Sequence, residues 1–532
     1  MYHYLLLITL VMIACVLCNK ISAKLGIPTL LAFILLGMLF GSDGLLKIPF
    51  DNFQFAEQIC SVALIFIMFY GGFGTNWKEA RPVAAQAIAL SSVGVVLTAG
   101  ITGLFCRLVL RFGWWESFLI GSVISSTDAA SVFSILRSKR LNLKHHTASL
   151  LEVESGSNDP FAYMLTMICL TMMGESVSGA QIIWMLLLQI VLGIVFAAAI
   201  AAATLWFLDR FQFAAAGFDA IFILAIAVLS YAAPAALGGN GYLSAYLVGL
   251  ILGNRRLKNK KSLVHFFDGV TGLMQMLIFF LLGLLAFPSR MPNVLLPSLA
   301  IALFLTFIAR PLAVAVLLSP FHGQWRQEAL VSWAGLRGAA SIVFAIMATI
   351  QSTAMENDLF HIVFCIVLFS ILIQGSLLPW SARKLQMIDE HANVLKTFND
   401  YSEEVPVQFI RLTVRPDHPW AGRLLRQVLL PPDTLVVLLL RNGERIVPNG
   451  DTVLLEGDIL ILSAKAAGPM EGIYLTEIPI DPESDWIGKP VSTLDVGPDR
   501  LIIMIQREDR IVIPRGTTII QEGDLLVLNQ TN

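Results

Sequence analysis

Long apolar runs separated by short polar loops make up the first 386 residues of the chain. Most of these runs extend over about 16–25 residues, the length with which an α-helix crosses the hydrocarbon core of a bilayer. The pattern predicts an all-α polytopic membrane protein with about thirteen transmembrane helices, of which the ninth is short and has weakly marked ends. The approximate bounds are 3–18, 27–41, 59–75, 84–106, 115–136, 147–173, 181–206, 218–236, 241–253, 268–287, 294–317, 329–351 and 360–382.

The composition supports a membrane location. Of the 532 residues, 56% are hydrophobic and only 14% are charged, whereas a soluble protein carries roughly 25% charged residues. The first run lacks a basic leader and a small-residue cleavage signal, so we expect a membrane span and not a signal peptide. The six cysteines lie in apolar runs without a CxxC spacing, which indicates packing residues and not disulfides or a metal site.

The distribution of basic residues predicts how the spans are oriented. Loops that follow odd-numbered runs contain 17 lysines and arginines, whereas loops that follow even-numbered runs contain four. Because basic loops stay on the cytoplasmic side, we expect the N-terminus outside and the C-terminal tail in the cytoplasm. This orientation requires an odd number of spans, and thirteen satisfies it.

The last part of the chain differs in both hydropathy and charge. Residues 387–532 hold 13 basic and 22 acidic residues, whereas the preceding part holds 23 and 16. We expect a membrane domain over 1–386, a linker over 387–405 and two related units over 406–467 and 472–530. Alternating apolar runs with Gly-Asp turns predict small α+β units rich in strands. Six positions recur at an offset of 66, which indicates a duplication: Trp420, Gly422, Pro448, Gly450, Gly457 and Asp458 return as Trp486, Gly488, Pro514, Gly516, Gly523 and Asp524.

The strongest candidate for a functional site is the stretch EVESGSNDP at residues 152–160. Apolar residues flank it on both sides, so its ionisable groups fall inside the predicted span 147–173. Each such group costs about 2.5–3.5 kcal/mol on insertion scales, and embedded charges usually mark ion pathways. The alternative is that Asp159 is a buried structural partner.

A second span offers matching chemistry. SSTDAAS at 125–131 places Thr127 and Asp128 near the middle of the fifth run, and hydroxyls and carboxylates are the hard oxygen ligands that alkali cations prefer. The segment DAASVFSI at 128–135 resembles GAASIVFAI at 338–346 in the twelfth run. Transporters built from inverted repeats interrupt corresponding helices near the midplane, which predicts inverted repeats with interrupted helices here. Close packing through small residues is the alternative interpretation.

Two arginines lie inside predicted spans. Arg337 is permanently charged and requires an anion or carbonyl groups around it. Glu154 lies about one helical turn before Asp159, and we expect Glu154 and Arg337 to form a neutralising scaffold ion pair. For Arg310, which precedes a proline, we expect hydrogen bonds to backbone carbonyls at a kink.

These motifs carry a resemblance to a known family. ESGSNDP, SSTDAAS, GLRGAAS and the early GIPTLLAFILLGMLFG together resemble the monovalent cation:proton antiporters, closest to the cell-volume-regulation type of potassium/proton antiporter. The resemblance covers nearly all of residues 1–386. The duplicated tail resembles the C-terminal subdomain of regulators of potassium conductance, the TrkA C-terminal type, over about 406–530.

The resemblance assigns roles to particular residues. It implies a cation- and proton-binding aspartate at Asp159 preceded by Asn158, a site shaped or coordinated by Thr127, Asp128 and Ser155, and an ion pair of Glu154 with Arg337. The chain departs from many relatives in the third span, where Tyr70 stands in place of an acidic residue. That departure weakens any inference about which cation is selected.

The activity that the resemblance implies is an electroneutral exchange of potassium for protons by alternating access, regulated by the tail. It implies no enzymatic activity, no cofactor, no metal beyond the transported cation and no nucleic acid. We expect a multi-pass protein of a bacterial inner membrane, in contact with lipid and forming a homodimer. The tail is expected to bind a small molecule or nucleotide.

Three alternative functions differ in how well they fit the sequence. A sodium/proton antiporter has the same motifs, so the sequence leaves the cation open between potassium and sodium. A cation channel gated by the tail would normally carry a TVGYG-like filter, which does not occur here. A membrane-anchored sensor would leave Asp128, Asp159 and Arg337 without a role.

Overall fold

The computed structural model describes residues 2–389 and 407–531 apart from short gaps. These gaps fall at 26–27, 140, 175–177, 212–216, 256, 258, 322–323, 352–354, 417, 432–433, 442–443, 466–472, 481–483, 495, 497–499, 508–509 and 513. The chain divides into a membrane unit, Met1–Ser402, and a tail unit, Glu403–Asn532. Most of the linker predicted over 387–405 lies outside the described residues.

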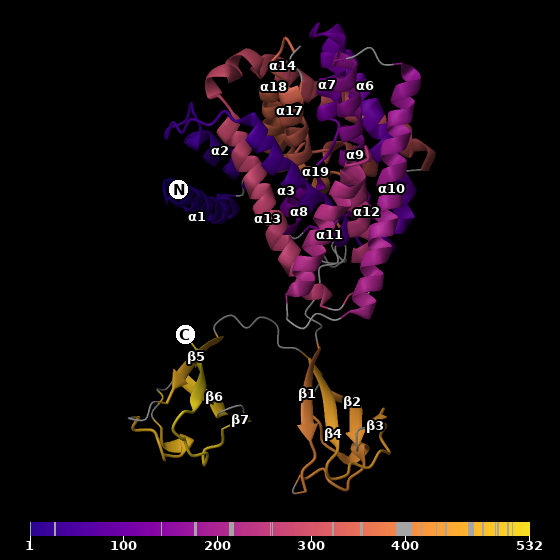
Figure 1. The fold of residues 1–532 in the computed structure, drawn as a ribbon. Helices are drawn as coiled ribbons and strands as arrows, with labels where there is room; N and C mark the ends of the chain where they lie inside the picture. The colour runs from indigo at the N-terminus through magenta and orange to yellow at the C-terminus, as the bar shows by residue number, and fades with distance from the viewer. Residues whose placement is uncertain are drawn as a thin grey trace. The chain divides into compact units, whose positions relative to one another are not determined.

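The membrane unit consists of helices that run largely along a common direction (Figure 1). In the described residues they form thirteen consecutive spans, as the hydrophobic pattern predicts, and seven of the helices are long and apolar enough to cross a bilayer by themselves. The spans are α1 (Tyr2–Leu25), α2 (Thr29–Phe40), α3 (Phe53–Gly74), α4 to α6 (Trp77–Leu108), α7 (Trp114–Val123) with α8 (Ala129–Ser138), α9 (Thr147–Gly174), α10 (Gly179–Arg210), α11 (Phe218–Ala235), α12 (Gly241–Gly253), α13 (Lys260–Leu285), α14 (Met291–Phe304) with α15 (Arg310–Leu318), α16 (Trp325–Trp333) with α17 (Ala339–Gln351), and α18 (Leu359–Phe369) with α19 (Ser376–Lys384).

Two spans are interrupted at corresponding places. The fifth is non-helical at 124–128, between α7 and α8, and the twelfth is non-helical at 334–338, between α16 and α17. Each break follows a half-helix of nine or ten residues and precedes a run of small residues, which confirms the predicted interruptions. Backbone groups freed in this way must find partners inside the protein, because the bilayer core offers none.

Glycines allow the helices around the breaks to approach closely. A side chain at Gly72 of α3 would lie 2.1 Å from the Tyr246 carbonyl of α12, and one at Gly249 would lie 2.1 Å from the Phe69 carbonyl. Gly37 of α2 and Gly283 of α13 meet in the same manner. Small residues that let backbones approach are the usual device of membrane helix packing, and here they hold α3 and α13 beside the core of the unit.

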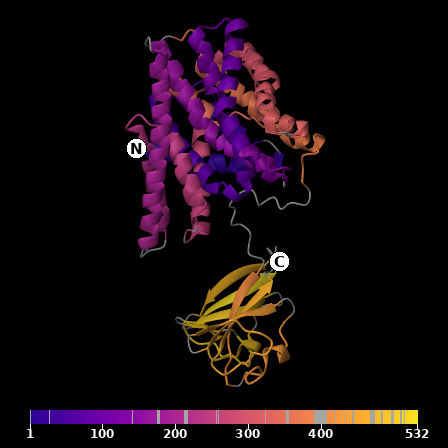
Figure 2. The same cartoon turned by 90° about the vertical axis from the view of Figure 1, so that its right-hand side faces the viewer.

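The tail unit contains two antiparallel four-stranded sheets of identical topology (Figures 1 and 2). Their strand orders are β1-β4-β2-β3 and β5-β8-β6-β7, and the irregularity between Val436 and Leu438 recurs between Ile502 and Met504. The buried core residues recur at the offset of 66, which fits a duplicated unit. The strands are β1 (Val407–Thr413), β2 (Thr434–Arg441), β3 (Glu444–Ile446), β4 (Ile459–Lys465), β5 (Ile473–Pro479), β6 (Arg500–Arg507), β7 (Arg510–Val512) and β8 (Leu525–Thr531).

Each sheet contains an equivalent bidentate ion pair between an arginine and an aspartate. Arg441 donates to both carboxylate oxygens of Asp458 at 2.8 and 2.7 Å, and Arg507 binds Asp524 in the same way at 2.7 and 2.7 Å. The Arg441 guanidinium lowers the pKa of Asp458 below its ordinary value. A depressed folded-state pKa means that this stabilisation is present above about pH 4 and is lost as the pH falls further.

Candidate functional site

A cavity of about 720 Å³ lies where the two interrupted spans meet α9. Four of the residues that the sequence predicts as ligands line this cavity, namely Thr127, Asp128, Ser155 and Asp159. They come from two spans that are brought together only by the fold. The cavity also contacts α1, α2, α3, α13 and α17, so it is enclosed by elements from both halves of the membrane unit.

Asp128 sits at the start of α8 and caps it. Its Oδ1 accepts from the Ser131 backbone N–H at 3.2 Å, and its Oδ2 accepts from the Ser131 hydroxyl at 2.5 Å. The same carboxylate lies against Gly338, where an added Cβ would be 2.0 Å from Oδ2. Asp128 therefore faces the positive N-terminal ends of both α8 and α17, an arrangement that favours a negative charge there.

The break in the fifth span is held to α9 by short hydrogen bonds. The Ser155 hydroxyl donates to the Thr127 carbonyl at 2.7 Å, and the Asn158 amide donates to the Thr127 hydroxyl at 2.6 Å. Asn158 is fully buried, so its amide acts as a spacer that orients Thr127. Thr127 and Asp159 both line the cavity.

Asp159 is buried, with 5% of its surface exposed, and it lines the cavity. Among the described residues, nothing donates a hydrogen bond to its Oδ1. The next residue, Pro160, lies inside α9 and has no N–H, so the helix leaves the Gly156 carbonyl without its usual partner. A carboxylate and a backbone carbonyl therefore lie about one turn apart beside the cavity. Both oxygens can bind a cation, whereas only the carboxylate can also take up a proton.

Glu154 does not bind the arginine that the sequence predicts. Its carboxylate pairs with Arg310 at 2.6 and 2.8 Å, so the expected partner, Arg337, is wrong, and so is the expected carbonyl-binding role of Arg310. Both members of the pair are almost fully buried. A π-helical turn at Leu305–Ala309 directly precedes Arg310, and Pro311 cannot donate to the turn before it, which accounts for the change in winding.

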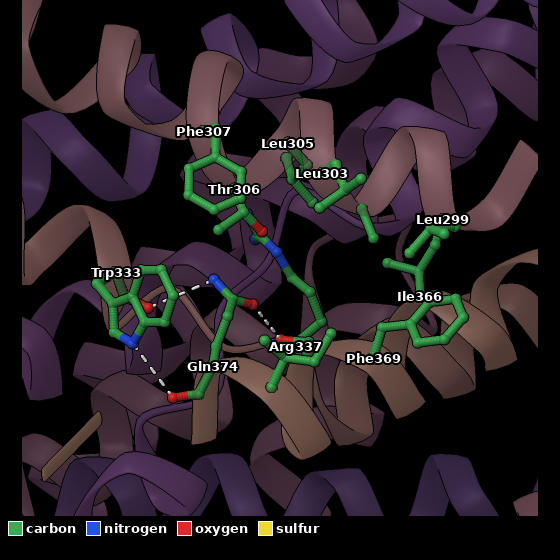
Figure 3. A pocket seen from close by; sticks show the side chains of 13 residues that line it. Leu299, Leu303, Leu305, Thr306, Phe307, Trp333, Arg337, Ile366, Phe369 and Gln374 are labelled. Atoms are coloured by element: carbon green, nitrogen blue, oxygen red, sulfur yellow. Dashed lines mark hydrogen bonds between the residues drawn. The ribbon is translucent and has the colours of Figure 1, made fainter. Parts of the chain in front are cut away.

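Arg337 takes the carbonyl-binding role instead. Its guanidinium donates to the Ser125 and Ser126 carbonyls at 2.8 and 2.6 Å, so it satisfies acceptors that the break in the fifth span has freed. Its backbone N–H donates to the Ser370 hydroxyl, which in turn donates to Gln374. Figure 3 shows Arg337 in a small pocket beside Trp333 and Gln374, with Phe307 and Phe369 on its walls.

The sequence interpretation missed several residues of the cavity. Glu152 lies in the quoted stretch, two helical turns before Asp159, and is buried in the same wall. Its spacing of seven could have identified it. Asp268, Thr271 and Gln275 of α13 line the opposite wall, and their spacing of three and four was a signal for a polar helix face.

Comparison with known proteins agrees with this geometry. Residues 7–384 match the family described as "Sodium/hydrogen exchanger, transmembrane". The chain belongs to the sodium/hydrogen exchanger family. The exchanger's tail matches the TrkA-C domain twice, at 409–468 and 475–528, which confirms the predicted resemblance of both parts of the chain.

Several relatives are named as cation/proton antiporters. The exchanger is 34% identical to the K(+)/H(+) antiporter NhaP of Alkalimonas amylolytica over 87% of this chain and 82% of that one. It is 35% identical to the K(+)/H(+) antiporter NhaP2 of Shewanella sp. (strain MR-4) over 84% and 78%. The solved sodium proton antiporter MjNhaP1 from Methanocaldococcus jannaschii has 25% identity and a TM-score of 0.64, covering 72% of this chain and 99% of that one.

The corrected ion pair leads to a first prediction. Removing one member of a buried pair leaves the other charge uncompensated, at a cost of about 3–5 kcal/mol. Glu154→Gln and Arg310→Gln should each lower the unfolding temperature of the purified exchanger, and the double variant should lose less than the sum. The matched control combines Glu154→Gln with Arg337→Gln. If that control shows the larger coupling in thermal unfolding, the assignment of Arg310 as partner is wrong.

Proposed function

We propose that the exchanger is an electroneutral monovalent cation/proton antiporter, with potassium as the principal cation and Asp159 as the carrier. The observation that carries this proposal is the position of Asp159, which is buried, lines a largely apolar cavity and has one carboxylate oxygen that no described residue satisfies. An ionised carboxylate is costly away from water unless it is paired. Asp159 therefore gains from holding either a proton or a cation.

Competition for one carboxylate yields exchange. A cation and a proton cannot both be held stably by the same ionised group, so binding of one favours release of the other. The cavity would open alternately to the two sides of the membrane. If this switch occurs only when Asp159 holds a proton or a cation, proton entry on one side is coupled to cation entry on the other. The oxygens of Thr127 and Ser155 lie within the same cavity and suit a dehydrated alkali cation.

Several other charged groups near Asp159 have partners of their own. Glu154 and Arg310 neutralise each other, Arg337 binds carbonyls, and Asp128 caps α8. Asn158 carries no charge and is occupied with Thr127. Two acidic residues of 152–160 line the cavity, Glu152 and Asp159, and we assign the cycling proton to Asp159 because it directly follows Asn158, which bonds to Thr127. A single cycling carboxylate supports one cation for each proton and an exchange that the membrane voltage does not drive.

Potassium is favoured by the names of the relatives. Those with 34–35% identity are named K(+)/H(+) antiporters, whereas the Na(+)/H(+) antiporter 1 of Methanocaldococcus jannaschii is 27% identical over 62% of this chain. Sodium/proton exchange is the alternative. The basic loops lead us to infer an outside N-terminus and a cytoplasmic tail. From the relatives in Alkalimonas and Shewanella we infer a bacterial inner membrane, and we retain a homodimer as part of the proposal.

The test is proton movement in everted membrane vesicles after addition of potassium or sodium. Asp159→Asn should abolish the cation-dependent signal, since the amide has nearly the same shape but cannot cycle a proton. Asp209→Asn, at the end of α10 and outside the cavity lining, is the matched control and should exchange normally. Exchange that persists in Asp159→Asn at matched expression would overturn the role of this residue.

We also propose that the tail regulates exchange through the first residues of the linker. The segment Met387–Asp389 pairs with the loop Asn142–Lys144, which joins α8 to α9. Lys144 N–H donates to the Met387 carbonyl at 2.9 Å, and Asp389 N–H donates to the Asn142 carbonyl at 3.0 Å. We call these two paired segments the linker bridge. It connects the start of the linker to the loop between the two site-bearing helices, so a displacement of the linker would reach both of them.

The linker bridge can be tested in the full chain. Asp389→Pro removes the N–H that bonds to Asn142, whereas Asp389→Ala removes the same side chain and keeps that N–H. The proline variant should exchange cations but show the pH dependence of a chain truncated after Gln386, while the alanine variant should behave as the unmodified exchanger. A proline variant with an unchanged pH profile, alongside a truncation that alters it, would contradict coupling through the bridge.

A further inference from the structure

Helix α13 lines the cavity with several polar residues. None of them is among the ligands that the sequence predicts. Asp268, Thr271 and Gln275 lie three and four residues apart, so they share one helix face, and all three line the cavity. The neighbouring Leu263 and Phe267 are buried in an apolar cluster. The cavity-facing side of α13 therefore combines these three oxygen-bearing residues with the apolar Leu273 and Met276.

Among the described residues, Thr271 is one of four buried threonines whose hydroxyls have no hydrogen-bond partner, and it is the one of the four that lines the cavity. In this exchanger Thr166 and Thr349 donate their hydroxyls to the carbonyl four residues earlier, at 2.8 Å each, as threonines in helices often do. Thr271 is 8% exposed, yet its hydroxyl has no hydrogen-bond partner among the described residues. An unsatisfied buried hydroxyl costs about 1–3 kcal/mol, so its position beside the cavity indicates a ligand there.

Asp268 supplies charge one turn away from Thr271. Its carboxylate is exposed, and the Tyr70 hydroxyl of α3 lies 3.5 Å from its Oδ1 across the cavity. This contact is longer than the 2.5–3.0 Å usual for O–H···O bonds, so it compensates little of the carboxylate charge. By the predicted orientation, Asp268 lies in the cytoplasmic part of α13, because that helix begins directly after a basic loop.

We propose that Asp268 and Thr271 form a second monovalent-cation site, which takes up the cation from the cytoplasm before it reaches Asp159. The inference rests on the proposed antiport function. A carboxylate and a hydroxyl are hard oxygen ligands suited to an alkali cation, and a single partly solvated charge attracts the ion without holding it tightly. A cavity lined by one sign of charge raises the local concentration of counter-ions, and weak binding allows onward transfer.

The expected kinetic effect is on apparent affinity. In everted vesicles the cytoplasmic face is accessible, so the cation concentration at this mouth can be varied directly. Asp268→Asn should raise the apparent KM for potassium roughly three- to tenfold while leaving the maximal rate nearly unchanged. The effect should shrink as an impermeant salt raises the ionic strength, because screening weakens the attraction in the unmodified exchanger.

Further variants separate cation binding from a structural role. Thr271→Val removes the hydroxyl at nearly constant volume and should raise KM, whereas Thr271→Ser keeps the hydroxyl and should not. Tyr70→Glu combined with Asp268→Asn places a carboxylate across the same part of the cavity and should restore much of the affinity. Asp209→Asn, a charge change outside the cavity lining, is the control and should leave KM unchanged.

The outcomes distinguish this inference from the proposed function. Unchanged KM in Asp268→Asn and Thr271→Val, with normal exchange in the parent, would overturn the second site and leave the antiporter assignment intact. Equal KM increases in Thr271→Val and Thr271→Ser would also overturn it, since packing would then be the cause. Absence of cation-dependent proton movement in the parent chain, at confirmed insertion, would instead overturn the proposed function.

Discussion

The membrane unit depends on hydrogen bonds between two chain segments that are not helical. Where the fifth and twelfth spans break, each frees backbone groups that water cannot reach, and each supplies partners to the other. Arg337 of the twelfth span donates to the Ser125 and Ser126 carbonyls, and the Leu336 carbonyl accepts from the Asp128 N–H at 2.8 Å. An arginine is suited to this role because it stays charged and has several donors in a fixed geometry.

Most of the charged side chains near the two breaks are held in hydrogen bonds and ion pairs, which leaves few carboxylates there to titrate. The Asp128 carboxylate faces two helix N-termini, and Glu154 is held by Arg310. Each of these charges fixes backbone or helix ends, and α9 attaches to the fifth span through Ser155 and Asn158. The cost of embedding so many polar groups is met by mutual pairing. Asp159 lines the cavity with one carboxylate oxygen that no residue in the described part of the chain satisfies.

Much of this arrangement could be predicted from the sequence, since length, apolarity and basic loops are local properties that the bilayer enforces. The two breaks and the stretch 152–160 could be recognised for the same reason. Each contains polar or small residues within a run where a lipid-facing helix would have apolar ones. The partner of Glu154 could not be predicted, because Arg310 and Arg337 are both buried in the membrane unit and the local sequence does not show which of them lies beside Glu154. Asp268 was missed because one acidic residue near a basic helix start resembles an ordinary interfacial residue.

The central claim is that a cation and a proton compete for one carboxylate, and proton release tests it most directly. Potassium is added to the purified full-length exchanger in weakly buffered detergent solution near the pH at which half of the sites are protonated, while a pH indicator follows the protons. The account predicts saturable release that approaches the protonated fraction of one site per chain, with the same concentration dependence as potassium binding measured by calorimetry. Potassium binding without any proton release at that pH would contradict it.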